Sequence, residues 1–170
     1  MLGPVRIWIA ALVALGLAAP AGGEPYAVGS VLPALSLEDQ HGEPRTLDAL
    51  VRVVLFRRDM GGGGVIKQAL VDDGPDFLER NGAICVADVS AMPGFALRLM
   101  ARPAMRRRPY PTLLDEHGDA TADFPSQKGK ATLLFLERSK VVRITYAGTA
   151  GVLRGALEPI APGEVAAEER

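Results

Sequence analysis

Two arginines and four glycines stand together directly after an apolar run that is typical of a buried strand: Arg57, Arg58 and Gly61, Gly62, Gly63 and Gly64. Bare backbone N–H groups at the start of a helix can bind an anion, and an arginine can add charge-assisted hydrogen bonds to it. Glycine in regular structure costs about 0.5–1 kcal/mol in conformational entropy, so some contact must offset four of them. These residues, the glycine corner, therefore allow two interpretations: a permissive surface loop, or a cradle for an anion or carboxylate ligand. A nucleotide is not expected, because neither Gly-x-x-x-x-Gly-Lys-Ser/Thr nor Gly-x-Gly-x-x-Gly spacing occurs.

A second segment, residues 89–114, contains five arginines and no acidic residue, and so carries a charge of +5. A run of charge is most often a solvated face. The alternative is contact with an anionic partner, such as an acidic protein surface, lipid headgroups or a cell-envelope polymer. The arginines of this arginine patch are Arg98, Arg102, Arg106, Arg107 and Arg108.

The chain has one cysteine, Cys85, which cannot form an internal disulfide. It lies in the apolar run 83–87, which is typical of a fully buried strand. A buried cysteine is usually an inert small hydrophobe, and this is the expected role. The alternative is a reactive thiol that forms a mixed disulfide with a partner.

Other chemistry finds little support in the sequence. The formal net charge of −1 and the 5% aromatic content give no reason to expect binding to nucleic acid. The two histidines, His41 and His117, lie in separate expected turns, so no metal site is predicted. No sequence motif for cofactor binding occurs, so no cofactor is expected. Asp88 and Asp115 both end expected strands and could meet in space.

The first 21 residues have the pattern of a secretory signal: Arg6, then the apolar run 7–19, then Ala19-Pro20-Ala21 as a cleavage region. Thirteen apolar residues fall short of the ~20 that span a bilayer, so no stable membrane span is expected after cleavage. The predicted organisation is a signal segment at 1–21, one domain at 22–158 and a frayed tail at 159–170. The expected location is the bacterial periplasm.

Within the domain, strand patterns alternate with helical patterns, which indicates an α/β layer structure. Strands are expected at 35–38, 51–57, 83–87, 112–114, 132–136 and 141–146, and helices at 65–71, 75–80, 93–101 and 150–157. The helix at 93–101 is expected to be interrupted by Pro103. Two hairpins are expected in the second half, one from 112 to 125 and one from 132 to 146.

Three segments carry a resemblance to a known family. The stretch GSVLPALSLEDQHG at 29–42, followed by VVLF at 53–56, resembles the N-terminal part of peroxiredoxins (the AhpC/TSA family) and related thioredoxin-fold proteins. YPTLLDEHG at 110–118 and ATLLF at 131–135 are similar to later segments of the same family. The layout also resembles that of the secreted YtfJ-type thioredoxin-like proteins. The resemblance implies an α/β, thioredoxin-like fold with a central mixed sheet flanked by helices.

The chain departs from this family at the residues that perform its chemistry. Thioredoxins carry Cys-x-x-Cys where this chain has Gly61 and Gly64, and a peroxiredoxin would have a thiol a few residues further on. Leu55 and Ala131 stand where thioredoxins place a buried acid and a cis-proline. Thiolate is the attacking species in both reactions, so no catalytic residue is expected. The sequence predicts a non-redox binding or assembly module with a periplasmic protein or an anionic envelope component as partner; the alternative is an oxidoreductase that uses Cys85.

Overall fold

A five-stranded mixed sheet forms the centre of the protein, as the sequence predicts. The computed structural model describes residues 23–73 and 76–158, so the expected signal segment and tail lie outside the described residues. The strand order is β5-β4-β3-β6-β7; β3, β4 and β5 are parallel, while β6 and β7 are antiparallel to their neighbours. The strands are β3 (Val53–Arg57), β4 (Ala83–Asp88), β5 (Thr112–Asp115), β6 (Ala131–Glu137) and β7 (Lys140–Ala147).

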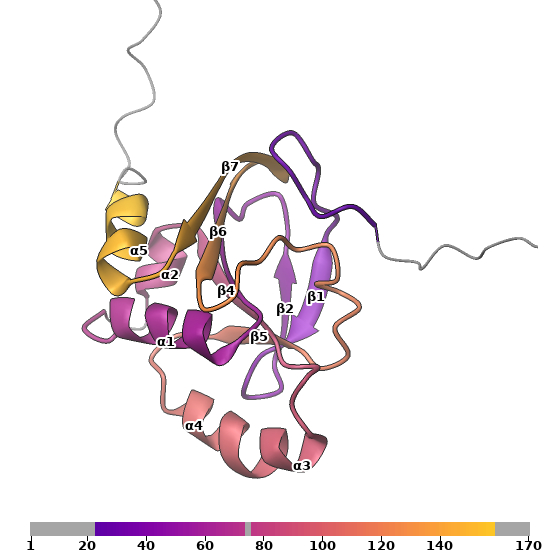
Figure 1. Cartoon of the computed structure of the whole chain (residues 1–170), viewed down its shortest axis with the longest axis vertical. Helices are drawn as coiled ribbons and strands as arrows, with labels where there is room; N and C mark the ends of the chain where they lie inside the picture. Colours follow the sequence, from indigo (N-terminus) through magenta and orange to yellow (C-terminus); the bar gives the residue numbers. More distant parts are fainter. Residues whose placement is uncertain (1–22, 74–75, 159–170) are drawn as a thin grey trace, which may run out of the picture.

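One face of this sheet is covered by helices that contribute a common apolar core. These helices are α1 (Met60–Ala69), α2 (Phe77–Arg80) and α5 (Ala150–Leu157), and they lie side by side in Figure 1. Alternate residues of β3 divide between the two faces: Val53 and Leu55 face these helices, and Val54 and Phe56 face the other way. The inner strands β3, β4 and β6 are therefore covered on both sides, which explains their nearly continuous apolar sequences.

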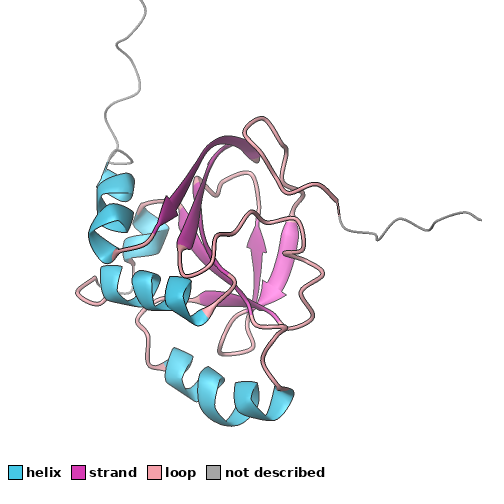
Figure 2. Ribbon diagram, in the orientation of Figure 1, coloured by secondary structure: helices cyan, strands magenta, loops and turns pink. Residues whose placement is uncertain are grey.

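The opposite face is covered by a small antiparallel hairpin, β1 (Leu35–Glu38) and β2 (Pro44–Leu47). In Figure 2 this hairpin lies on the side of the sheet away from α1 and α5. Gln40, in its turn, is fully buried; its amide nitrogen donates to the Tyr110 carbonyl at 3.0 Å and its oxygen accepts from the Thr112 N–H at 2.7 Å. The turn is thus fixed to the start of β5. Strand β2 was not expected, because three of its four residues are exposed and give no apolar pattern.

The arginine-rich helix is longer than expected. It runs from α3 (Gly94–Ala96) through the π-helical turn η1 (Leu97–Ala101) into α4 (Arg102–Arg106). The N–H of Arg102 donates five residues back to the Leu97 carbonyl, and Pro103 then falls in the first turn of α4, where its missing N–H is not needed. The π turn therefore carries the helix past the proline that was expected to interrupt it. Leu97 and Met105 anchor the helix on the ends of β4 and β5.

The first of the two expected hairpins is not formed. β5 pairs with β4, in parallel, and is bridged at Leu113 by Asp39, but no strand follows between 116 and 130. The chain instead wraps around the buried carboxylate of Asp115, which accepts hydrogen bonds from the N–H of Gly118 and from the N–H and hydroxyl of Thr121, each at 2.8 Å. These turn contacts satisfy the backbone without a second strand. The second expected hairpin, β6–β7, is confirmed.

Candidate functional site

The four glycines lie inside helix α1, so their interpretation as a surface loop is wrong. A Cβ atom on Gly62 would lie 2.3 Å from the Lys130 carbonyl oxygen, and one on Gly61 would lie 2.8 Å from the Gly129 Cα. A Cβ atom on Gly63 would lie 2.8 Å from the Arg57 Cδ, whereas one on Gly64 would meet nothing within 4 Å. Three of the glycines therefore let α1 approach its neighbours closely, which offsets their entropic cost.

The N-terminus of α1 holds an anion that belongs to the chain itself. Asp59 is the N-cap: its Oδ1 accepts from the Gly62 N–H at 2.8 Å, and its Oδ2 accepts from the Gly129 N–H at 2.6 Å. The hydrogen bond from Gly129, followed by that from Gly62, lowers the pKa of Asp59. The carboxylate thus takes the place that the sequence analysis gave to an external anion. Its position three residues before Gly62 is the N-cap spacing that could have indicated this.

Arg57, the last residue of β3, is buried without a good partner. It is 6% exposed, its aliphatic stem packs on Gly63, and its Nε has no hydrogen-bond acceptor. One terminal nitrogen donates to the Met105 Sδ at 3.6 Å, and a thioether is a weak acceptor. Burial, and then the positive charge of Arg108, lower the pKa of Arg57. The guanidinium therefore sits in a poorly compensated environment.

Arg57 belongs to a cluster of four groups: it lies with Cys85 of β4 and with Arg108 and Tyr110, which belong to the segment between α4 and β5. Burial raises the pKa of Cys85 to about 12, and the charges of Arg108 and Arg57 oppose this shift. Burial, and then Cys85, raise the pKa of Tyr110 to about 12, and the neighbouring Arg108 side chain opposes this shift. Among the residues that the structure describes, neither Arg57 nor Arg108 takes part in an ion pair. The cluster therefore carries two positive charges without an ion pair, and the carboxylate of Asp59 acts on Arg57 only through its charge.

A cavity of about 280 Å³ opens beside this cluster, between α1 and the helix 94–106. It lies near the carboxyl ends of β3 and β4, which is where open α/β sheets usually bind their ligands. Its lining has three cationic side chains and no acidic one, with methionine and alanine making up most of the rest. The lining residues are Arg57, Met60, Gly63, Gly64, Lys67, Met92, Ala101, Ala104, Met105 and Arg108. We call this the arginine cavity.

Arg58, the other arginine of the glycine corner, is fully engaged elsewhere. Its Nε lies 3.3 Å from an oxygen of Asp88, and a terminal nitrogen donates to the Thr121 carbonyl at 2.5 Å. Asp88 also accepts from the N–H and hydroxyl of Ser90. Asp88 and Asp115, which the sequence left open to meet in space, are register partners on β4 and β5, but each carboxylate is held by its own donors. Each carboxylate therefore stabilises the loop that follows its own strand.

The arginine patch is divided by the structure. Arg102 pairs with Glu116, and the Arg106 Nε donates to the Gln40 carbonyl at 3.0 Å. Arg98 and Arg107 are exposed, and Arg108 belongs to the cluster around Arg57. From their sequence positions, Arg57 and Arg108 were expected to belong to separate sites. Nothing in the local pattern could have joined them, because the length and path of the helix 94–106 decide where Arg108 lies.

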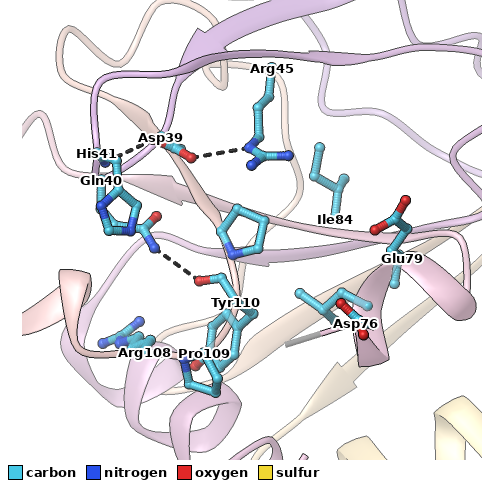
Figure 3. Close-up of a pocket in the computed structure, with 13 residues that line it drawn as sticks. Asp39, Gln40, His41, Arg45, Asp76, Glu79, Ile84, Arg108, Pro109 and Tyr110 are labelled. Carbon is cyan, nitrogen blue, oxygen red and sulfur yellow. Dashed lines mark hydrogen bonds and ion pairs between the residues drawn. The ribbon is translucent and has the colours of Figure 1, made fainter. Parts of the chain in front are cut away.

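A larger cavity of about 490 Å³ lies between the β1–β2 turn and α2 (Figure 3). Its deep polar groups are satisfied within the chain: Asp39 accepts from the N–H of His41 at 2.8 Å and from the Arg45 Nε at 3.1 Å, and Gln40 binds the backbone as described above. Asp76 and Glu79 line it as well, so its charges are mixed. It is the weaker candidate site, because Asp76 and Glu79 offset the positive charges of Arg45 and Arg108, which also line it, and the buried Asp39 and Gln40 have partners within the chain.

Two further properties concern the described residues only. Within 23–73 and 76–158, no group of three or more histidine, cysteine, aspartate or glutamate side chains could hold a metal ion. No helix in the same ranges has the length and apolar character needed to cross a membrane.

Comparison with known proteins identifies the fold class. A crystal structure of an uncharacterized conserved protein from Geobacillus kaustophilus is similar with a TM-score of 0.56 and 18% identity, over 85% of this chain and 87% of that one. The crystal structure of peroxidoxin BcpB from Mycobacterium tuberculosis is similar with a TM-score of 0.53 and 22% identity, over 78% of this chain and 95% of that one. The thioredoxin domain of a thiol-disulfide oxidoreductase from Bacteroides vulgatus is similar with a TM-score of 0.50 and 16% identity, over 79% of this chain and 97% of that one. No family model matches the sequence, and no curated protein does.

The chain therefore has a thioredoxin-like fold, and the predicted fold class is confirmed. Its structural neighbours include peroxiredoxin-like and thioredoxin-like proteins, while the likeness to YtfJ-type proteins stays a prediction. Leu55 and Ala131, where the family resemblance implies an acid and a cis-proline, are both fully buried, and the described residues contain no cis peptide bond.

Proposed function

We propose that this protein is an exported, periplasmic binding protein that uses a thioredoxin-like fold without thiol chemistry. The observation that carries the proposal is the state of Cys85, the only cysteine in the chain. Its side chain is 1% exposed in the middle of the sheet, and burial raises its pKa to about 12. A thiol in this state is neither ionised nor accessible near neutral pH, so it cannot attack a disulfide or a peroxide.

The alternative, an oxidoreductase that forms a mixed disulfide through Cys85, is opposed by the same geometry. Cys85 lies on β4 between β3 and β5, where it is the register partner of Leu55 and Thr112. Its side chain belongs to the core shared with α1, α2 and α5, so a partner's sulfur could reach it only after part of this covering layer moves away. Such an opening would expose part of the apolar core and is therefore costly.

The binding surface is placed at the carboxyl ends of β3 and β4, where the arginine cavity lies. Beside it, the helix 94–106 exposes Phe95, Leu99 and Met100, which are 70%, 76% and 70% exposed, next to the free charge of Arg98. A surface that combines apolar side chains with uncompensated positive charge suits an anionic partner in the periplasm or envelope. The glycine corner contributes through Arg57 and the close approach of α1, and the arginine patch through Arg98, Arg107 and Arg108.

Turnover assays on the purified chain test the proposal. We expect no reduction of insulin by dithiothreitol above the uncatalysed rate and no consumption of hydroperoxide, because no reactive thiol is present. The Cys85→Ser variant should behave like the parent chain in both assays. A second assay should trap partners from periplasmic extract with and without reductant, followed by mass spectrometry. Partners that depend on Cys85 and vanish with reductant, or turnover that Cys85→Ser abolishes, would contradict the proposal.

A further inference from the structure

We propose that the arginine cavity binds a small organic carboxylate, whose head group pairs with Arg57 and Arg108 and whose apolar part lies among the methionines. This inference rests on the proposed binding function and names the ligand class of its site. Three independent features of the cavity support it: an uncompensated buried charge, a lining without acids, and an apolar, deformable wall.

The uncompensated charge is the first feature. The Arg57 side chain is buried, with 6% of its surface exposed. Its Nε nevertheless has no acceptor, and its one hydrogen bond goes to a thioether. A buried guanidinium normally pairs with a carboxylate or with several carbonyl oxygens, because losing water is costly for a charge. Arg108 adds a second charge of the same sign close by. An anionic ligand would supply the missing partner for both.

The acidic residues nearest in sequence form no ion pair with Arg57, although the charge of Asp59 acts on it. Asp59 is held at the N-terminus of α1 by the N–H groups of Gly62 and Gly129. Asp88 is held by Arg58 and Ser90. No acid lines the cavity, and Lys67 at its side adds a third positive charge. The electrostatic potential inside the cavity is therefore positive, and the chain leaves the site for an external anion.

The wall of the cavity favours an organic anion over a mineral one. Met60, Met92 and Met105 line it, and methionine adapts its shape to apolar ligands. A volume of about 280 Å³ lies just below the ~300–1,000 Å³ typical of ligand pockets, so the ligand is small. Met60 is 75% exposed, so the apolar wall continues to the protein surface. A carboxylate with a short hydrocarbon chain matches both the planar fork of an arginine and this wall.

Hexanoate is the probe for the test. Hexanol is the control that keeps the hydrocarbon chain but lacks the charge, and inorganic phosphate is the control that is an anion but lacks the chain. We expect hexanoate to raise the melting temperature of the full chain and to shift the amide signals of Gly63, Gly64 and Met105. Hexanol and phosphate should each bind at least tenfold more weakly, because each lacks one half of the recognition. Phosphate binding as tightly as hexanoate, or hexanol binding as tightly, would overturn the assignment of a carboxylate ligand.

Variants separate a ligand site from a structural arginine. Arg57→Met keeps the length and apolar stem of the side chain, and should weaken hexanoate binding at least tenfold without lowering the melting temperature of the free protein. Gly64→Leu should block the cavity from α1, since a Cβ atom at Gly64 meets no atom within 4 Å. Arg143→Met, on β7, is the control and should bind hexanoate like the parent chain. Unchanged binding in both cavity variants would overturn the inference.

The two proposals fail in different ways. Absence of hexanoate binding in a folded parent chain, combined with absence of thiol turnover, would overturn only the ligand assignment. Thiol turnover that depends on Cys85 would overturn the proposed function regardless of what the cavity binds.

Discussion

Arg57 and Arg58 are neighbours in the sequence, yet they have opposite environments. Arg58 pairs with Asp88 at the end of β4 and donates to backbone carbonyls of the loop 116–130, at residues 121, 122 and 124. Arg57 points into the arginine cavity, where only a methionine sulfur accepts from it. The first region is a closed network that stabilises the fold. The second is an open network, because the guanidinium of Arg57 lacks an oxygen acceptor within the chain. This difference indicates that a ligand would bind at Arg57 and not at Arg58.

The largest effect is expected in the closed region, at Asp115. The side chain is 3% exposed and accepts four hydrogen bonds, from the N–H groups of His117, Gly118 and Thr121 and from the Thr121 hydroxyl. Asp115→Ala leaves these donors without an acceptor in a buried site, and should lower the free energy of unfolding by about 3–5 kcal/mol. Urea denaturation measures it. A loss below about 1 kcal/mol would show that the loop is not held by this carboxylate.

The glycines of α1 give the next largest effect and a matched control. Gly62→Ala places a methyl group 2.3 Å from the Lys130 carbonyl oxygen, and should destabilise the protein by about 1–3 kcal/mol. Gly64→Ala meets no neighbour within 4 Å and should stabilise it by about 0.5–1 kcal/mol, since alanine is the better helix former. Thermal unfolding of both variants measures the difference. If both substitutions changed stability in the same direction, helix propensity and not close approach to Lys130 would account for the effect of these glycines.

Replacing the two arginines in turn tests the comparison itself. Arg58→Met removes a partly exposed ion pair and several hydrogen bonds to carbonyls, and should cost about 1–2 kcal/mol. Arg57→Met removes a buried charge that has no counterion, and should leave stability unchanged or raise it. Both variants are measured by urea denaturation at neutral pH. A larger loss for Arg57→Met than for Arg58→Met would contradict the distinction between the open and closed regions.

The smallest expected effect on stability concerns the cap of α1. The pKa of Asp59 is lowered from its ordinary value of 3.8, so its carboxylate stabilises the folded state above about pH 4, and this contribution is lost as the pH falls through the folded-state pKa. Asp59→Asn keeps much of the capping hydrogen bonding but removes the charge, and should cost below about 1 kcal/mol near neutral pH. The difference between parent and variant should shrink below pH 4. A difference that is constant from pH 2 to pH 7 would exclude the carboxylate as its source.

Much of the fold could be predicted from the sequence, because the buried strands are continuous apolar runs. β3, β4, β6 and β7 and the final helix were all expected, as was the burial of Cys85. β2 could not be found, since an exposed strand such as Pro44–Leu47 is held by pairing and not by its own pattern. The helix 94–106 was expected to stop early, because a π turn that carries a helix past a proline leaves no signature in the residues.

The candidate site was less predictable than the fold. Arg57 and Arg108 were both singled out, but as parts of different surfaces. Their convergence depends on where the helix 94–106 packs on β4 and β5, which is a tertiary contact. Asp59 could have been read as an N-cap from its spacing to Gly62, and that would have assigned the helix N-terminus to an internal anion. The missing counterion of Arg57 is visible only in three dimensions.

Alkylation of Cys85 in the native protein tests the central claim, that this fold works without thiol chemistry, most directly. Iodoacetamide should leave the thiol unmodified between pH 7 and pH 9, and should label it fully once the protein is unfolded in urea, because the native side chain is 1% exposed and its pKa is raised to about 12. Labelling of the folded protein at the rate of a free thiol would contradict the account.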